Sequence, residues 1–105
     1  MSAPNLNYIK ELSGGDVEFE ARLLSVLKKE LPLEIEEFNE NIQQNNLRES
    51  AQNVHKIKHK INILSMDQSF VVAEEFEKNL NSGCLDLYEE FIDILKKMTI
   101  FLNQF

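Results

Sequence analysis

Apolar side chains recur every three or four positions along most of the chain, which is the period of an amphipathic α-helix. The first long stripe consists of Leu24, Leu27, Leu31, Ile35, Phe38 and Ile42. The last one consists of Leu87, Phe91, Ile94, Met98, Phe101 and Phe105. No stretch shows the period-two alternation of a strand. We therefore expect an all-α protein and interpret the stripes as the buried faces of its helices.

Capping and turn-forming residues divide this pattern into segments. Residues 5–12 predict a short first helix, and Asp16 is suited to cap the N-terminus of the next one. Pro32 lies inside that second pattern and either kinks the helix or splits it. Residues 65–68 have the spacing of a capping box, and Gly83 marks a later helix end. Four main helices with short connections predict an up-down-up-down four-helix bundle with a short extra N-terminal helix.

The composition indicates a globular protein for which polyanions are disfavoured as main partners. The chain has 105 residues, 43% of them hydrophobic and 28% charged, so we expect a single domain spanning residues 1–105. The formal net charge of -7 disfavours nucleic acid and anionic membranes as partners. With one cysteine, no signal-like N-terminus and no apolar run of about 20 residues, we expect a cytoplasmic protein outside the membrane.

The segment NVHKIKHKINIL at residues 53–64 stands out, because both histidines and three lysines fall within six consecutive positions of an acidic chain. On a helical projection, the apolar side chains form one core face made of Val54, Ile57, Ile61 and Leu64. His55 lies on the flank of that face, with His59 and Asn62 near it and Met66 extending the same strip. We therefore expect the imidazole of His55 to be exposed.

An exposed neutral imidazole is a nucleophile near neutral pH. If His55 attacked a phosphoryl group, the product would carry negative charge. Lys58, three positions on, and His59, four positions on, lie within reach of that charge. The alternative is a solvated basic face on which the histidines have no chemical role. These residues alone leave both interpretations open.

A predicted hairpin around residue 66 brings one carboxylate to the level of His55. His55 lies 11 residues before this turn and Glu77 lies 11 after it. Glu77 could then accept a hydrogen bond from one ring nitrogen and leave the other free to attack. Taken by itself, Glu77 would be an ordinary exposed glutamate of a helix.

A metal site is a further alternative for the two histidines. His55 and His59 are four positions apart, which can place two imidazoles on one ion. A zinc site would need at least one more ligand, and Lys56 and Lys58 would repel a cation. We therefore expect no metal site here.

Taken together, these residues resemble a histidine-containing phosphotransfer (HPt) domain. His55, Ile57 and Lys58 match the family's histidine, apolar residue and lysine. Leu64 matches its later leucine, and the pair Phe76–Glu77 matches its Leu-Glu pair without a gap. The stretch LSGGDVEFEARLLSVLKKELP resembles the usual lead-in, so the likeness covers nearly the whole chain. It implies an up-down four-helix bundle with the histidine exposed on a helix face.

The resemblance implies a phosphocarrier that passes a phosphoryl group between receiver-domain aspartates in two-component phosphorelay signalling. His55 would be the phosphoacceptor, Lys58 would stabilise the phosphoryl group and Glu77 would orient the imidazole. The receiver would dock on a face made of Lys56, His59, Asn62, Ile63 and Met66. The partners would be response-regulator receiver domains or a hybrid sensor kinase, and the chain a monomer. We expect no cofactor, since Mg²⁺ would sit on the receiver, and no kinase activity, since there is no Gly-rich phosphate loop.

The chain departs from the family pattern beside the histidine. Four positions after the histidine, where the family usually has glycine, this chain has His59. Lys60 and Ile61 stand where the family has small residues, and Ser65 replaces its later glycine. We expect these changes to narrow the approach to His55 and to add charge. They could tune the choice of receiver, or mark a pseudo-HPt module that binds receivers without carrying phosphate. His59 could hydrogen-bond the phosphoryl group or compete for it.

Overall fold

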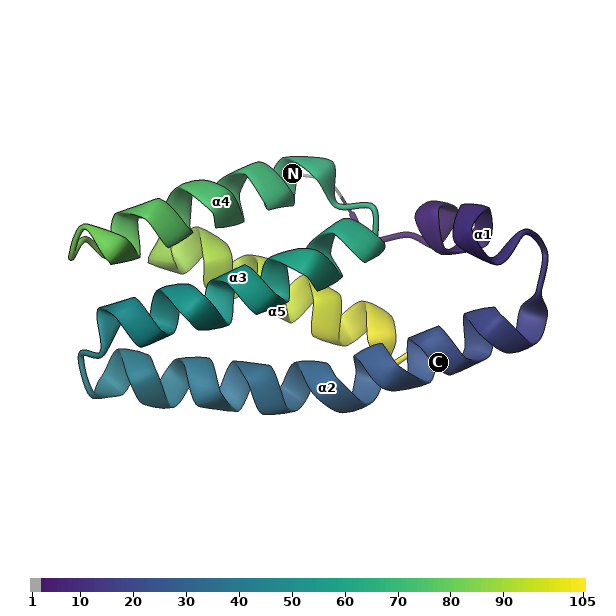
Figure 1. Cartoon of the computed structure of the whole chain (residues 1–105), viewed down its shortest axis with the longest axis horizontal. Coiled ribbons are helices and arrows are strands. Elements are labelled where there is room, and N and C mark those ends of the chain that lie inside the picture. Colours follow the sequence, from purple (N-terminus) through teal and green to yellow (C-terminus); the bar gives the residue numbers. More distant parts are fainter. Residues whose placement is uncertain (1–2) are drawn as a thin grey trace.

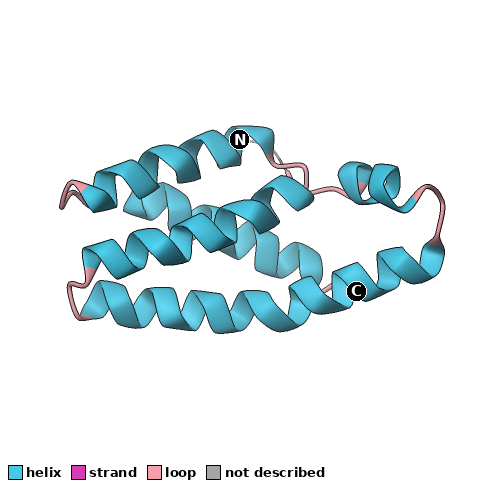
Figure 2. Ribbon diagram, in the orientation of Figure 1, coloured by secondary structure: helices cyan, strands magenta, loops and turns pink. Residues whose placement is uncertain are grey.

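The computed structural model describes residues 3–105, and these residues are almost entirely helical. Figures 1 and 2 show helices joined by loops, with no strand in this range. The helices are α1 (Asn7–Ser13), α2 (Val17–Gln43), α3 (Leu47–Ile63), α4 (Asp67–Asn81) and α5 (Tyr88–Leu102). The all-α prediction is therefore confirmed.

The helices α2 to α5 form an up-down-up-down bundle, and α1 is the short extra helix (Figure 1). In Figure 1, α3 and α4 run antiparallel next to each other, α2 runs along the other side of α3, and α5 lies behind them. Because α2 is much longer than α3, its N-terminal part extends past the bundle, where α1 packs beside it. This bundle holds α3 between α2 and α4, with one long side of it facing solvent.

Local sequence explains where the first two helices begin. Asp16 caps α2 as expected, because its carboxylate accepts a hydrogen bond from the backbone N–H of Phe19 at 3.1 Å. The first helix starts at Asn7 rather than residue 5, and the side chain of Asn5 accepts a hydrogen bond from the Asn7 N–H at 2.9 Å.

Pro32 lies within α2 without splitting it. It sits on the exposed side, where water can reach the carbonyl that loses its partner.

Three of the connections end their helices in the same way. Asn45, Ser65 and Gly83 have φ values of 59°, 62° and 80°, which is the left-handed conformation. The next residue in each turn then donates its N–H to the carbonyl five positions back: Asn46 to Asn41 at 2.8 Å, Met66 to Ile61 at 3.2 Å and Cys84 to Asn79 at 2.8 Å. This satisfies carbonyls at the helix end and reverses the chain within a few residues.

Ser65 does not form the predicted capping box. Helix α4 does begin at this point, but no side chain caps its first turn. The hydroxyl of Ser65 instead accepts a hydrogen bond from the backbone N–H of Tyr8 at 3.2 Å, and the N–H of Asn5 donates to the carbonyl of Leu64 at 3.0 Å. Ser65 has a left-handed φ of 62°, a conformation that glycine adopts more readily than other residues.

The core lies where the apolar stripes predict it. Its largest aromatic side chains are Phe38, Phe76 and Phe91, all fully buried, with ring centroids 5.2–6.2 Å apart. The last stripe extends too far in the prediction, because Leu87 precedes α5 and Phe105 follows it, with 52% of Phe105 exposed. Over residues 3–105, none of the helices has the length and apolar content to cross a bilayer.

Candidate functional site

Helix α3 presents His55 to solvent, as the helical projection predicts. The core face Val54, Ile57, Ile61 and Leu64 is fully buried. The side chain of His55 is 55% exposed. Since one stripe of α3 packs between α2 and α4, its remaining strip is left open along the surface. The imidazole therefore lies on a rigid helix at a position that another protein can reach.

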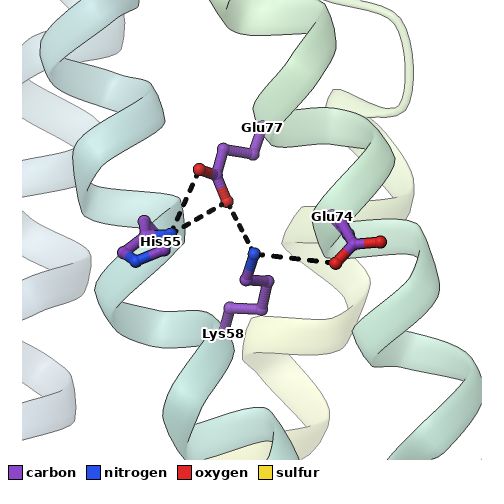
Figure 3. Close-up of polar contacts among 4 residues, drawn as sticks. All are labelled: His55, Lys58, Glu74 and Glu77. Atoms are coloured by element: carbon purple, nitrogen blue, oxygen red, sulfur yellow. Dashed lines mark hydrogen bonds and ion pairs between the residues drawn. The ribbon is translucent and has the colours of Figure 1, made fainter.

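Glu77 on α4 lies beside the imidazole, as the hairpin register predicts. Its carboxylate oxygens are 3.2 and 3.4 Å from Nδ1 of His55 (Figure 3). A carboxylate can only accept hydrogen bonds, so this contact favours the tautomer with the proton on Nδ1. In that tautomer, the lone pair is on Nε2, which points away from Glu77 in Figure 3. The free nitrogen is thus the outward one.

Lys58 points toward α4 rather than toward the open side of His55. Its Nζ lies 3.0 Å from Glu77 and 3.9 Å from Glu74 (Figure 3), and its side chain is only 11% exposed. The ammonium also lies 5.5 Å from the centre of the Phe70 ring. The sequence predicts Lys58 near the phosphoryl group, whereas here Glu77 is shared between Lys58 and His55. Lys58 thereby fixes the carboxylate that faces the ring.

The predicted docking residues differ in their exposure. Lys56, His59 and Asn62 are exposed, and Ile63 is half-buried against the core. Met66 is fully buried, so its assignment to the docking face is wrong. The prediction extended the strip of α3 past its last turn, but the chain reverses at Ser65 and turns the next side chain into the core.

Sequence reasoning missed part of the surface beside His55. An open depression of about 430 Å³ lies there between α3 and α4. Besides His55, Lys56 and Glu77, it is lined by Arg48, Ala51, Gln52 and Asn81. Arg48 precedes His55 by seven positions, which is about two helical turns, so the helical period was the signal that could have found it. The depression adds a guanidinium to the positive side of the site.

Lys60 does not add charge to the approach to His55, which corrects the prediction. Its side chain is buried against α2, with Nζ 3.0 Å from Glu30 and 2.9 Å from Glu34. Burial by itself lowers the pKa of this ammonium, but the hydrogen bonds to Glu34 and Glu30 and their negative charges outweigh it. The pKa of Lys60 is therefore raised above its ordinary value of 10.5.

His55 and His59 are in ring contact but have no third metal ligand. Their ring centroids are 5.2 Å apart and the planes are nearly perpendicular, at 88°. Within residues 3–105, no group of three or more histidine, cysteine, aspartate or glutamate side chains is placed to hold a metal ion. The described part of the chain thus offers two exposed imidazoles flanked by cations and one carboxylate.

One of the comparisons with known proteins identifies a family for this chain. The family model of the Hpt domain matches residues 22–104, which include α3, α4, α5 and most of α2. Searches among curated proteins and among solved structures give no significant match. Hpt domains are helical bundles that act as histidine phosphotransfer modules in phosphorelays, together with receiver domains and kinases. The chain belongs to the Hpt domain family.

Proposed function

We propose that this protein is a phosphocarrier that relays a phosphoryl group between receiver-domain aspartates, with His55 as the phosphoacceptor. The observation that carries the proposal is the exposed ring of His55 with its Nδ1 held by Glu77. This arrangement leaves Nε2 as a free nucleophile on a surface that a second protein can cover.

The reaction is a reversible exchange of one bond for another. The lone pair of Nε2 attacks the phosphorus of an aspartyl phosphate on the receiver, and an N–P bond forms as the P–O bond to the aspartate breaks. The aspartate carboxylate leaves with the electron pair. The return step passes the group to a second receiver in the same way. We expect the receiver to contribute Mg²⁺, which would neutralise charge on the phosphoryl oxygens during both steps.

Glu77 and Lys58 act on the ring rather than on the phosphoryl group. As electron density leaves Nε2, positive charge develops on the imidazole, and the carboxylate of Glu77 next to Nδ1 stabilises it. Lys58, 3.0 Å from the same carboxylate, holds Glu77 in place. Both are positioning residues in this proposal, and His55 alone forms a covalent bond.

The charge around His55 suits a receiver. The chain is acidic overall, at -7, but Arg48 and Lys56 lie on the exposed strip of α3 around His55. A receiver's phosphorylated aspartate is an anionic target, so these two cations favour docking in the orientation that brings it to His55. Asn62 and the half-buried Ile63 extend the contact surface toward the α3–α4 turn.

The test is to mix the protein with receiver domains that carry labelled phosphate on aspartate. Wild type is compared with His55→Gln and His59→Gln, and a reaction with ATP alone serves as the control for autonomous kinase activity. We expect label on the wild type and on His59→Gln, none on His55→Gln and none from ATP. The label should be lost in acid and survive base.

Two results would contradict the phosphocarrier. If the label disappears only in His59→Gln, the phosphoacceptor is His59, one helical turn after His55. Measurable binding of several receivers without any label would make the protein a pseudo-HPt module that binds receivers and carries no phosphate.

A further inference from the structure

The residue in place of the family glycine forms part of the surroundings of His55. His59 follows His55 by four positions, so their side chains are neighbours on one face of α3. Their rings touch edge to face, with centroids 5.2 Å apart. Both residues are exposed. The second imidazole therefore lies next to the ring that would carry the phosphoryl group.

The lysines beside His59 are committed elsewhere. Lys58 is 3.0 Å from Glu77, and its side chain is 11% exposed. Lys60 is bound to Glu30 and Glu34 on the opposite side of α3. Both ammonium groups thus already bind carboxylates that come from other helices. His59 is next to the reactive ring, and the structure gives its ring nitrogens no hydrogen-bond partner on residues 3–105.

We propose that His59 donates a hydrogen bond to the phosphoryl group of phosphorylated His55. This inference rests on the proposed function and assigns to His59 the stabilising contact that the family pattern assigns to the lysine. A phosphoryl group extends beyond Nε2 by an N–P and a P–O bond, which is enough to reach a ring 5.2 Å from the His55 ring. An imidazole carries at least one N–H, and the phosphoryl oxygens are strong acceptors.

The contact exists only while His55 is phosphorylated. It therefore stabilises phospho-His55 relative to the free histidine and shifts the transfer equilibrium with a receiver toward this protein. A hydrogen bond to a charged group shifts such an equilibrium by about tenfold or more. The physical expectation is a carrier that retains its phosphoryl group more than one with glycine at this position.

The first experiment measures that equilibrium with a receiver that labels His55. We compare wild type with His59→Ala, His59→Phe and His59→Gln. Alanine removes the ring, phenylalanine keeps a ring without a donor, and glutamine keeps a donor without the ring. We expect His59→Ala and His59→Phe to move the equilibrium about tenfold toward the receiver, and His59→Gln to stay within about threefold of wild type. Urea unfolding of each variant checks that the exposed substitution leaves the fold intact.

Several outcomes would overturn the donor role. If His59→Phe behaves like wild type while His59→Ala does not, the ring acts by its bulk. If all three variants match wild type, His59 does not contact the phosphoryl group. If the group is found on His59 itself, this residue is an acceptor rather than a donor.

A second experiment keeps this inference separable from the proposed function. Phosphoramidate phosphorylates accessible histidines without a receiver, so ¹⁵N-labelled protein treated with it can be followed by NMR. We expect the ring nitrogens of His59 to shift when His55 is phosphorylated, and unchanged His59 signals would overturn the contact. Label from phosphoramidate but from no receiver would overturn the relay function and leave the His59 contact to be judged by these signals.

Discussion

Lys58 and Lys60 lie two positions apart on α3, and each is buried and paired with two glutamates. Lys58 faces α4, where it contacts Glu77 at 3.0 Å and Glu74 at 3.9 Å. Lys60 faces α2, where it contacts Glu30 at 3.0 Å and Glu34 at 2.9 Å. The composition of the two clusters is the same. The clusters differ in one contact: Glu77, a partner of Lys58, also contacts the imidazole of His55.

In the proposed function, this difference separates a cluster that acts on the reactive ring from one that holds two helices together. Replacing Lys58 by an uncharged residue would remove the ammonium that holds Glu77, the carboxylate that orients the imidazole. Removing the ammonium from the Lys60 cluster leaves two acidic side chains on α2 without their buried partner, and the reactive ring is not involved. The comparison teaches that two lysines on one helix can each pair with two glutamates and still differ in what those glutamates contact, since only Glu77 also reaches the imidazole of His55.

The largest effect on chemistry is expected for Glu77→Ala. Loss of the carboxylate leaves both imidazole tautomers available and removes the stabilisation of positive charge during transfer. We expect the rate of phosphotransfer from a receiver to fall about a hundredfold. Glu74→Ala on the same helix is the matched control, because Glu74 does not contact His55. Equal rates for the two variants would show that Glu77 has no special role.

Lys60→Met should destabilise the fold without changing the chemistry. Methionine keeps the aliphatic stem but leaves Glu34 without its buried partner. We expect the free energy of unfolding to fall by about 2 kcal/mol, less than for a fully buried pair because the side chain of Glu30 is 52% exposed. Urea unfolding measures this, with exposed Lys56→Met expected within about 0.5 kcal/mol of wild type. A slower transfer rate in Lys60→Met would contradict the division between the clusters.

Lys58→Met should slow transfer by about tenfold, less than the loss of Glu77 itself. The carboxylate of Glu77 remains, but it is no longer held in place by the ammonium. The rate is measured under conditions where the variant is fully folded, with Lys60→Met as the neighbouring lysine control. If Lys58→Met lowers stability but leaves the rate unchanged, the two lysines are equivalent and the comparison fails.

The smallest effect is the pH dependence of the Lys60 cluster. Because the pKa of Lys60 is raised in the folded state, its contribution to stability is fully present below pH 10.5. It is lost as the pH rises through the raised value. We therefore expect the stability difference between wild type and Lys60→Met to shrink above pH 10.5. Urea unfolding of both proteins at neutral and strongly alkaline pH measures it, and a constant difference would argue against the ion pairs.

The sequence predicts the parts of the fold and site that depend on period and symmetry. The flank position of His55 follows from the helical projection of α3. Its contact with Glu77 follows because an antiparallel hairpin pairs positions equally distant from the turn. Asp16 was recognisable as a cap because its role involves only residues near it in sequence.

The sequence does not predict the direction of long charged side chains. Lys58 and Lys60 both look like solvent-facing cations in a linear pattern. Each turns toward carboxylates that come from another helix, and those partners are known only from the three-dimensional packing. Met66 fails for a different reason, since the helical period no longer applies once the chain reverses at Ser65.

The three left-handed turns have a consequence for how quickly the molecule forms. With connections this short, α2, α3 and α4 each pack against their neighbour in sequence. Chains dominated by such local contacts fold fast, on the order of milliseconds or less. The hairpin turn at Ser65 sets the register between α3 and α4 as the two helices pack together. Refolding therefore reassembles the pairing of His55 with Glu77 without a slow search over alternative alignments.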